Sequence, residues 1–105
     1  MKNLYVDDIR TLPTKYNKDE WDIAKNYTQA IEMLTNNTYH TISLDHDIAS
    51  FDKTGKEFTG YDIVKWLVQR HFDGEYVPCN YMVHSANPIG AERMLGTINR
   101  YLINK

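Results

Sequence analysis

Residues 41–47 read Thr-Ile-Ser-Leu-Asp-His-Asp, a short apolar strand that runs directly into three ionisable side chains. Ile42 and Leu44 are two residues apart and therefore share one face of a strand. Three adjacent ionisable groups are costly to desolvate, so we expect them to face solvent or a ligand. In a continued strand, Asp45 and Asp47 would project to one side and His46 to the other. A polar turn that ends the strand is the alternative interpretation.

The composition predicts a single ordered domain. The 105 residues predict a single domain over residues 1–105, and 42% hydrophobic with 25% charged residues predicts an ordered fold rather than disorder. The net charge of −2 gives no sign of duplex DNA binding, although a small nucleotide bound in a site is compatible with it. Cys79 has no second cysteine to pair with, which suits a reducing cytoplasm, and no apolar stretch reaches the ~20 residues that span a membrane.

The rest of the chain alternates between predicted strands and predicted helices. Apolar or alternating runs predict further strands at residues 4–6, 21–25 and 79–83. Capping residues predict three helices: one at 29–35 after Thr28, one from Gly60 to a stop at Gly74 after a Thr59–Asp62 capping box, and one from Pro88 to the end of the chain after Asn87. Residues 46–59 are predicted to form a long polar loop, which is typical of lids and binding loops.

Strands that alternate with helices predict a parallel α/β sheet with helices on its faces. Right-handed crossovers restrict the topology further, and if strands 2 and 3 flank strand 1 on opposite sides, the order is 2-1-3-4. Ligands bind beyond the carboxyl ends of the strands in sheets of this kind, at the point where the winding reverses.

Acidic and imidazole side chains follow three of the four predicted strands. They are Asp7 and Asp8 after the first strand, Asp45, His46 and Asp47 after the third, and His84 after the fourth. Close carboxylates repel one another unless a proton or a cation intervenes. A divalent cation held by Asp7, Asp8, Asp45 and Asp47 is the natural solution, and Mg²⁺ favours oxygen ligands of this type. Capping of a helix or turn is the alternative role for Asp7 or Asp8.

The segment from His84 to Arg93 predicts a phosphate site next to these carboxylates. It starts a helix directly after a strand, and free backbone N–H groups at a helix start favour anions. We expect Ser85, Asn87, Gly90 and Arg93 to bind the phosphate, although helix packing for Gly90 and a solvated ion pair for Arg93 are alternatives. His84 is a candidate general acid or base because imidazole titrates near neutral pH.

Four blocks of sequence resemble a known family. They are Leu4-Tyr5-Val6-Asp7-Asp8-Ile9-Arg10, Ser43-Leu44-Asp45-His46-Asp47, Thr59-Gly60-Tyr61-Asp62 and the run from His84 to Met94. These blocks are similar to receiver domains of two-component signalling, and more closely to the cyclic-phosphate processing receiver domains. The resemblance implies a small flavodoxin-like, three-layer α/β sandwich. No fifth strand with the lysine of ordinary receivers follows, because residues 87–105 are predicted to be helical. The helix that receivers have between strands 1 and 2 is expected to be shortened or absent, because residues 9–20 contain Pro13, Asn17 and several charges.

The site residues together suggest hydrolysis or processing of a cyclic phosphate on a nucleotide or an RNA end. In this hypothesis Asp45, His46 and His84 are catalytic, with His84 carrying the proton and His46 positioning water or a ligand hydroxyl. One alternative is a non-catalytic module that senses or sequesters a nucleotide or a protein partner. A second alternative is an ordinary receiver that is phosphorylated on Asp45. The oligomeric state is left open.

Overall fold

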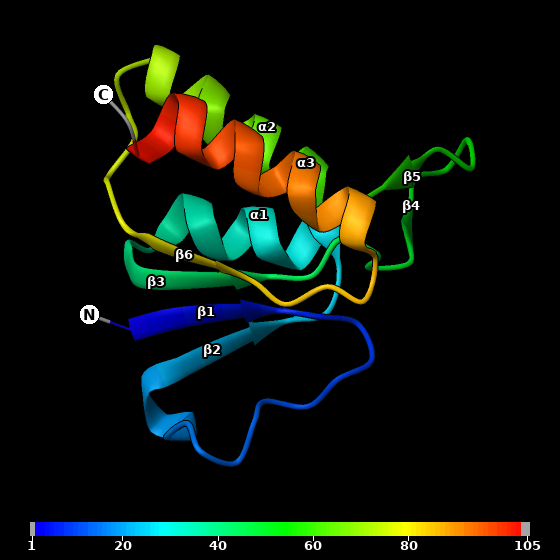
Figure 1. Ribbon diagram of the computed structural model, residues 1–105, viewed down its shortest axis with the longest axis vertical. Coiled ribbons are helices and arrows are strands. Elements are labelled where there is room, and N and C mark those ends of the chain that lie inside the picture. The colour runs from blue at the N-terminus through cyan, green and yellow to red at the C-terminus, as the bar shows by residue number, and fades with distance from the viewer. Residues whose placement is uncertain (1, 104–105) are drawn as a thin grey trace.

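The computed structural model describes residues 2–103, which fold around one parallel sheet (Figure 1). The four strands are β1 (Lys2–Val6), β2 (Trp21–Ala24), β3 (Tyr39–Leu44) and β6 (Asn80–Val83). They are ordered β2-β1-β3-β6, and every neighbouring pair is parallel. The predicted order 2-1-3-4 is therefore confirmed, with the fourth strand one residue shorter at its start and the second one residue shorter at its end than predicted.

The three α-helices lie on the same side of the sheet in Figure 1. They are α1 (Tyr27–Asn36), α2 (Gly60–Phe72) and α3 (Pro88–Ile98). Crossovers β2–α1–β3 and β3–α2–β6 run in the same direction across the sheet, so right-handed connections put α1 and α2 on one face. The apolar core lies between this face and the helices, and it includes Leu4, Val6, Ile42, Leu44, Ile63, Val64, Met94 and Ile98.

The β2 end of the opposite side of the sheet is covered by the connection between β1 and β2. This segment is irregular except for one 3-10 turn at Lys18–Glu20, and it passes below β2 in Figure 1. Tyr16 from the connection stacks on Trp21 of β2 with ring centroids 4.7 Å apart. The predicted third layer is thus formed by irregular chain, and the expectation that the helix between the first two strands is shortened or absent is confirmed.

The helix starts follow local capping chemistry. Thr59 and Asp62 form the predicted capping box at the start of α2, and the side chain of Asn87 accepts a hydrogen bond from the backbone N–H of Gly90 at the start of α3. The prediction that Thr28 caps the first helix is wrong. Asn26 is the cap, because its side-chain oxygen reaches the N–H of Gln29 at 2.8 Å and the helix has already begun when the chain arrives at Thr28.

Residues 46–59 contain a small antiparallel hairpin, so the prediction of a plain loop is wrong. Its strands are β4 (Ser50–Phe51) and β5 (Glu57–Phe58). The Asp52 side chain accepts hydrogen bonds from the backbone N–H groups of Thr54 and Lys56 and closes the turn. The hairpin is tied to α1, since Phe58 stacks on Tyr27 with centroids 4.5 Å apart.

The final helix is shorter than predicted. α3 ends at Ile98, and a π-helical segment, Asn99–Ile103, follows it and buries Leu102 against the core. The predicted continuation to residue 105 lies partly outside the described residues. None of the described helices is long and apolar enough to cross a membrane.

Candidate functional site

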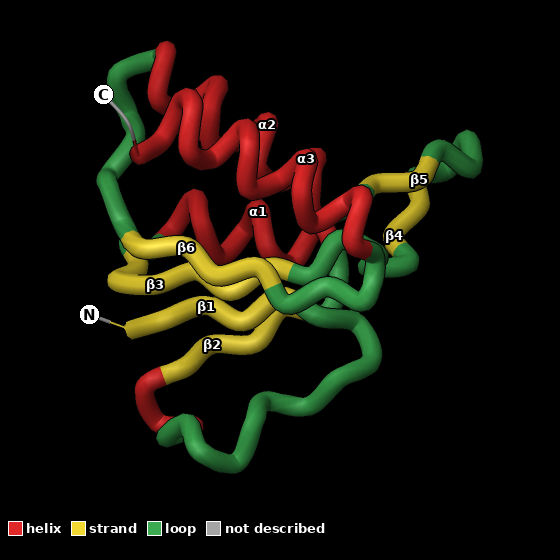
Figure 2. The backbone as a smooth tube through the Cα atoms, in the orientation of Figure 1, coloured by secondary structure: helices red, strands yellow, loops and turns green. Residues whose placement is uncertain are grey.

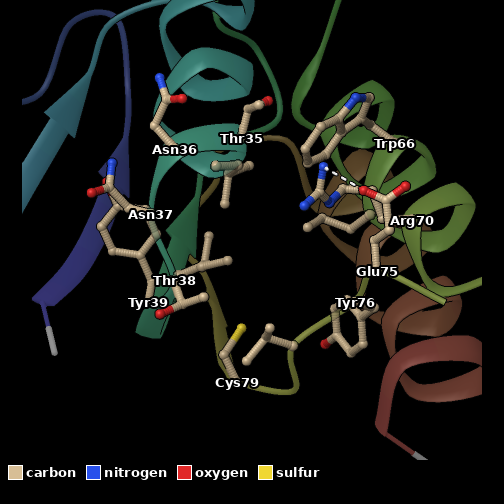
Figure 3. A pocket seen from close by; sticks show the side chains of 14 residues that line it. Thr35, Asn36, Asn37, Thr38, Tyr39, Trp66, Arg70, Glu75, Tyr76 and Cys79 are labelled. Carbon is tan, nitrogen blue, oxygen red and sulfur yellow. Dashed lines mark ion pairs between the residues drawn. The ribbon is translucent and has the colours of Figure 1, made fainter. Parts of the chain in front are cut away.

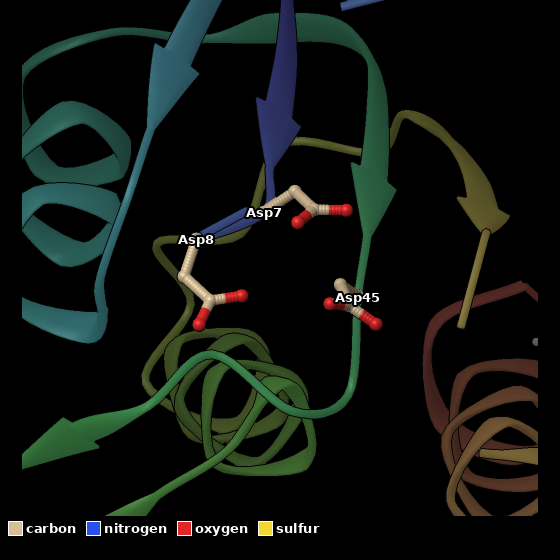
Figure 4. A group of neighbouring side chains, drawn as sticks. All are labelled: Asp7, Asp8 and Asp45. Carbon is tan, nitrogen blue, oxygen red and sulfur yellow. The ribbon is translucent and has the colours of Figure 1, made fainter. Parts of the chain in front are cut away.

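The carboxyl ends of β1, β3 and β6 open onto one edge of the sheet, where three aspartates converge (Figures 2 and 4). One carboxylate oxygen from each of Asp7, Asp8 and Asp45 lies within 4.8 Å of the other two. The strands continue through this point, because the N–H of Asp7 donates to the carbonyl of Ala24 and that of Asp45 to the carbonyl of Val6. Asp7 is 1% exposed and Asp45 is 9% exposed, so the cluster is largely shielded from water.

The three carboxylates differ in how their oxygens are satisfied. Oδ1 of Asp7 accepts the backbone N–H groups of Ile9 at 3.0 Å and Arg10 at 2.9 Å. Oδ1 of Asp45 accepts the N–H of His46 at 2.9 Å. Oδ1 of Asp8 is buried and has no hydrogen-bond partner among the described residues. An unpartnered buried carboxylate oxygen beside two other carboxylates fits a cation, because a cation supplies the missing contact and offsets the like charges.

The environment of Asp45 disfavours its negative charge. Burial raises the pKa of Asp45 above its ordinary value, and the charge of Asp7 raises it further. Hydrogen bonds from the Ser85 side chain and the His46 N–H lower the pKa but do not cancel this effect. A divalent cation would reverse the balance, since it favours the ionised form of every carboxylate that it contacts.

His84 lies beside the cluster with both ring nitrogens engaged. Its Nε2 is 3.1 Å from Oδ2 of Asp7, and its Nδ1 is 2.6 Å from the hydroxyl oxygen of Ser43. The ring stacks on Tyr5 at 4.4 Å, with the planes 4° apart. Burial lowers the pKa of His84, although the charge of Asp7 and its hydrogen bond oppose this shift. Contacts on two edges and one face thus fix the imidazole.

Ser43 and Tyr5 are site residues that the sequence analysis missed. Each alternates with core residues on its strand: Ser43 lies between Ile42 and Leu44, and Tyr5 lies between Leu4 and Val6. This alternation places both on the face of the sheet opposite the helices. It was the signal that could have identified them as neighbours of His84.

His46 packs against the first turn of α3 instead of lying with the carboxylates. A Cβ at Gly90 would come within 2.5 Å of Cγ of His46, so the glycine makes room for this ring. Nδ1 of His46 is 2.8 Å from Oδ1 of Asp47. The Asp47 side chain is 61% exposed, and the candidate metal-ligating group of the described residues does not include it.

The predicted phosphate-binding residues are partly engaged in local structure. The hydroxyl oxygen of Ser85 accepts the N–H of Asn87 at 3.0 Å, and Oδ1 of Asn87 accepts the N–H of Gly90 at 3.0 Å. The guanidinium of Arg93 lies 4.3 Å from the ring centre of Tyr61, in the groove between α2 and α3. A different arginine reaches the edge of the site: the guanidinium of Arg10 donates a hydrogen bond to the carbonyl of His84.

A cavity of about 310 Å³ lies at the other edge of the sheet (Figure 3). It is formed by the end of α1, the end of α2 and the segment before β6, and the ion pair of Arg70 with Glu75, at 3.8 Å, lies on one wall. Cys79 lines this cavity, and burial raises the pKa of its thiol. None of the predicted site residues lines it, so the cavity is separate from the acidic cluster.

Comparison of the sequence with known families gives a match. A family description, cyclic-phosphate processing receiver domain, matches residues 2–100. No curated protein and no solved structure gives a significant match to the chain. The match covers almost the whole sequence, and the parallel sheet flanked by helices is consistent with a receiver-like fold. The chain belongs to the family of cyclic-phosphate processing receiver domains.

Proposed function

We propose that this domain binds and hydrolyses a cyclic phosphate on a nucleotide or an RNA end, with the help of a divalent cation. The observation that supports the proposal is Oδ1 of Asp8, which is buried beside the carboxylates of Asp7 and Asp45 and has no hydrogen-bond partner among the described residues. The ring of His84 is in contact with one of these carboxylates, that of Asp7. The description of the family supports the cyclic phosphate as the group that is processed.

Asp7, Asp8 and Asp45 are the residues that would hold the cation, and Mg²⁺ suits their oxygen-only ligand set. When bound, the cation polarises a phosphoryl oxygen and lowers the pKa of a water molecule. His84 also orients Asp7, through the contact of its Nε2 with Oδ2 of that carboxylate. Asp47 lies outside the three-carboxylate group and is left as a residue of the rim.

Hydrolysis forms one bond from water oxygen to phosphorus and breaks one ring bond from phosphorus to ester oxygen. The proton of the attacking water must therefore leave, and the departing oxygen must gain one. We assign both transfers to His84, which takes the proton from the water and returns it to the departing oxygen. Its neutral form holds a proton on Nε2 toward Asp7 and accepts the Ser43 hydroxyl at Nδ1, and the Ser43 oxygen can accept in turn when Nδ1 is protonated.

The start of α3 offers the ligand a small set of donors. Pro88 has no N–H, and the N–H of Gly90 is taken by Asn87, so the N–H of Ile89 is the first-turn donor left for an anion. The Ser85 hydroxyl and the side-chain amide of Asn87 lie in the same turn. His46, wedged beside Gly90, holds this turn against the end of β3 and so has a positioning role.

The test is a turnover assay with nucleoside 2′,3′-cyclic phosphates, 3′,5′-cyclic nucleotides, cyclic dinucleotides and RNA that ends in a 2′,3′-cyclic phosphate. We expect activity with Mg²⁺ and none with EDTA, and a loss of about 10²-fold or more in kcat for His84→Ala and Asp8→Asn. His71→Ala is the matched control, because His71 lies at the end of α2 against Tyr76 and should keep full activity. Absence of turnover on every substrate, or full activity of His84→Ala, would count against hydrolysis.

A binding role without turnover is the second candidate, and one observation favours it. Both nitrogens of His84 already have partners within the protein, so a proton transfer must break or reverse one of these hydrogen bonds. If the domain is a sensor, a bound cyclic nucleotide will be recovered chemically intact by mass spectrometry after long incubation with Mg²⁺. Recovery of a linear monophosphate instead would exclude this candidate.

A further inference from the structure

Arg10 brings a positive charge to the site from the segment that follows β1. Its backbone N–H donates to Oδ1 of Asp7 at 2.9 Å, which fixes the start of this segment against the acidic cluster. Its guanidinium donates through Nη1 to the carbonyl of His84, after β6. Arg10 therefore spans from the end of β1 to the end of β6, two positions away in the sheet, and lies at the site edge.

The guanidinium of Arg10 is only partly used by the protein. Arginine has five N–H donors, and among residues 2–103 only Nη1 of Arg10 has an acceptor. The residue is exposed, so the other donors can be approached from solvent. A second cation stands nearby, since Nζ of Lys25, the residue after β2, lies 3.4 Å from the carbonyl oxygen of Arg10.

Arg10 also has an electrostatic effect on the site. Burial is the main reason that the pKa of His84 lies below its ordinary value, and the Arg10 charge adds to this lowering. The position of the arginine at the cluster is given by its two hydrogen bonds, to Oδ1 of Asp7 from its backbone and to the His84 carbonyl from its guanidinium. Arg93 is placed differently, because its guanidinium is held over Tyr61 in the groove between α2 and α3.

We infer that Arg10 is the anion-binding side chain of this site and takes the non-bridging phosphoryl oxygens of the ligand, while its contact with the His84 carbonyl holds the guanidinium in place. The inference rests on the proposed function and adds to it a residue that selects a negatively charged ligand. A planar fork of N–H donors matches two phosphoryl oxygens, which a lysine cannot do. The ligand class is accordingly an anionic phosphate ester rather than an uncharged nucleoside.

Calorimetry in Mg²⁺ with a nucleoside 2′- or 3′-monophosphate, and with the parent nucleoside, tests the inference apart from turnover. Arg10→Gln removes the charge but keeps an amide donor for the His84 carbonyl. We expect it to weaken monophosphate binding about tenfold to hundredfold. The affinity for the parent nucleoside, which binds more weakly than the monophosphate, should not change. Arg10→Lys should restore part of the loss, and Arg93→Gln, the matched control, should bind within about twofold of the wild type.

The inference is overturned if Arg10→Gln binds the monophosphate as the wild type does, if the wild type shows no saturable binding of it, or if Arg93→Gln alone loses affinity. Should Arg10→Gln not fold, the Arg10 Nε–Hε resonance of the wild-type protein, assigned with Arg10→Lys, replaces it: this resonance must shift on addition of monophosphate and not of nucleoside. Binding that depends on Arg10 without any turnover would refute hydrolysis only. Turnover with an unchanged KM in Arg10→Gln would refute this inference only.

Discussion

At the scale of single residues, Gly60 is the position where the site and the fold constrain each other most closely. Its N–H donates to the carbonyl of His46 at 2.8 Å, and a Cβ there would overlap the carbonyl oxygen of Asp45. Gly60→Ala must therefore push α2 away from the end of β3. We expect a loss of about 1–3 kcal/mol in the free energy of unfolding, measured by urea denaturation.

Gly96 provides the control for this substitution. It lies in α3, and a Cβ there would have no atom within 4 Å. Gly96→Ala should leave stability unchanged or raise it by up to about 1 kcal/mol, because alanine is the better helix former. Equal losses of stability in the two variants would show that the contact of Gly60 with Asp45 is not the cause of the loss.

The raised pKa of Asp45 predicts a dependence of stability on pH. The folded state disfavours the ionised carboxylate, so the ionised group weakens folding above its folded pKa, and the penalty vanishes as pH falls below the unfolded value of about 4. In EDTA, Asp45→Asn should be more stable than the wild type at pH 7 and equal to it near pH 3, as chemical denaturation across this range will measure. A variant that is less stable at pH 7 in EDTA would contradict the prediction.

The site residues that sequence predicts best are those that backbone topology alone brings together. Asp7, Asp8 and Asp45 follow adjacent parallel strands, so their convergence needs only the strand order. Asp47 was predicted with them, but beyond the end of β3 the chain turns and the period of two no longer holds. Arg10 was missed because the direction of a long side chain depends on an irregular segment that the pattern does not describe.

At the scale of elements, the capping box makes the start of α2 sensitive to acid. Burial raises the pKa of Asp62, but hydrogen bonds from Thr59 and the nearby Lys65 outweigh burial, and the net pKa is lowered. A lowered pKa means that stability is present above the unfolded pKa and is lost as pH falls through the folded one. Asp62→Asn should cost about 1 kcal/mol at pH 7 and less at pH 3, measured by thermal and urea unfolding.

Glu92 of α3 serves as the matched control for Asp62, because it is exposed and is not part of a cap. Glu92→Gln should change the free energy of unfolding by less than about 0.5 kcal/mol at either pH. If both variants lose stability equally, then general loss of negative charge and not the cap is responsible.

Element boundaries were harder to predict than the elements themselves. Asn26 and Thr28 are both good caps, and the choice between them is made by where β2 ends and not by the residue type. The β4–β5 hairpin has strands of two residues, too short for any period to be visible, and it is held by Phe58 on Tyr27. That contact is distant in sequence and invisible to local patterns.

For the whole molecule, the site predicts that cation binding and folding are linked. A ligand that binds only the folded state stabilises it, by about 2.7 kcal/mol at a concentration of 100 times its Kd. Mg²⁺ should therefore raise the melting temperature of the wild type, and EDTA should remove the gain. Asp8→Asn should abolish the effect, since Asp8 carries the unpartnered oxygen.

Asp47→Asn is the control for this effect, because Asp47 is exposed and outside the three-carboxylate group. It should keep the full Mg²⁺ response in the same melting experiment. A response that disappears in Asp47→Asn but persists in Asp8→Asn would place the cation elsewhere on this edge.

The global architecture was largely predictable because few topologies satisfy parallel pairing and right-handed crossovers. These rules leave few strand orders, among them the predicted order 2-1-3-4 that the structure confirms, and the sequence blocks give the family. The helix that receivers have between strands 1 and 2 was expected to be shortened or absent, because the segment after Asp8 contains Pro13 and several charged residues. The single 3-10 turn in this segment confirms the expectation. Local composition prevailed there over the pattern of the fold.

The stack of rings on the helix-free face has a practical consequence. Trp21 contacts Tyr5 edge-on, with ring centroids 6.3 Å apart, and Tyr5 stacks flat against His84. The Tyr5 ring therefore connects the Trp21 indole to the candidate proton carrier. In a Trp66→Phe variant, Trp21 is the remaining tryptophan of the sequence, and its fluorescence emission should respond to ligand binding at the acidic cluster. Arrival of a nucleotide could then be followed in real time without attaching a dye.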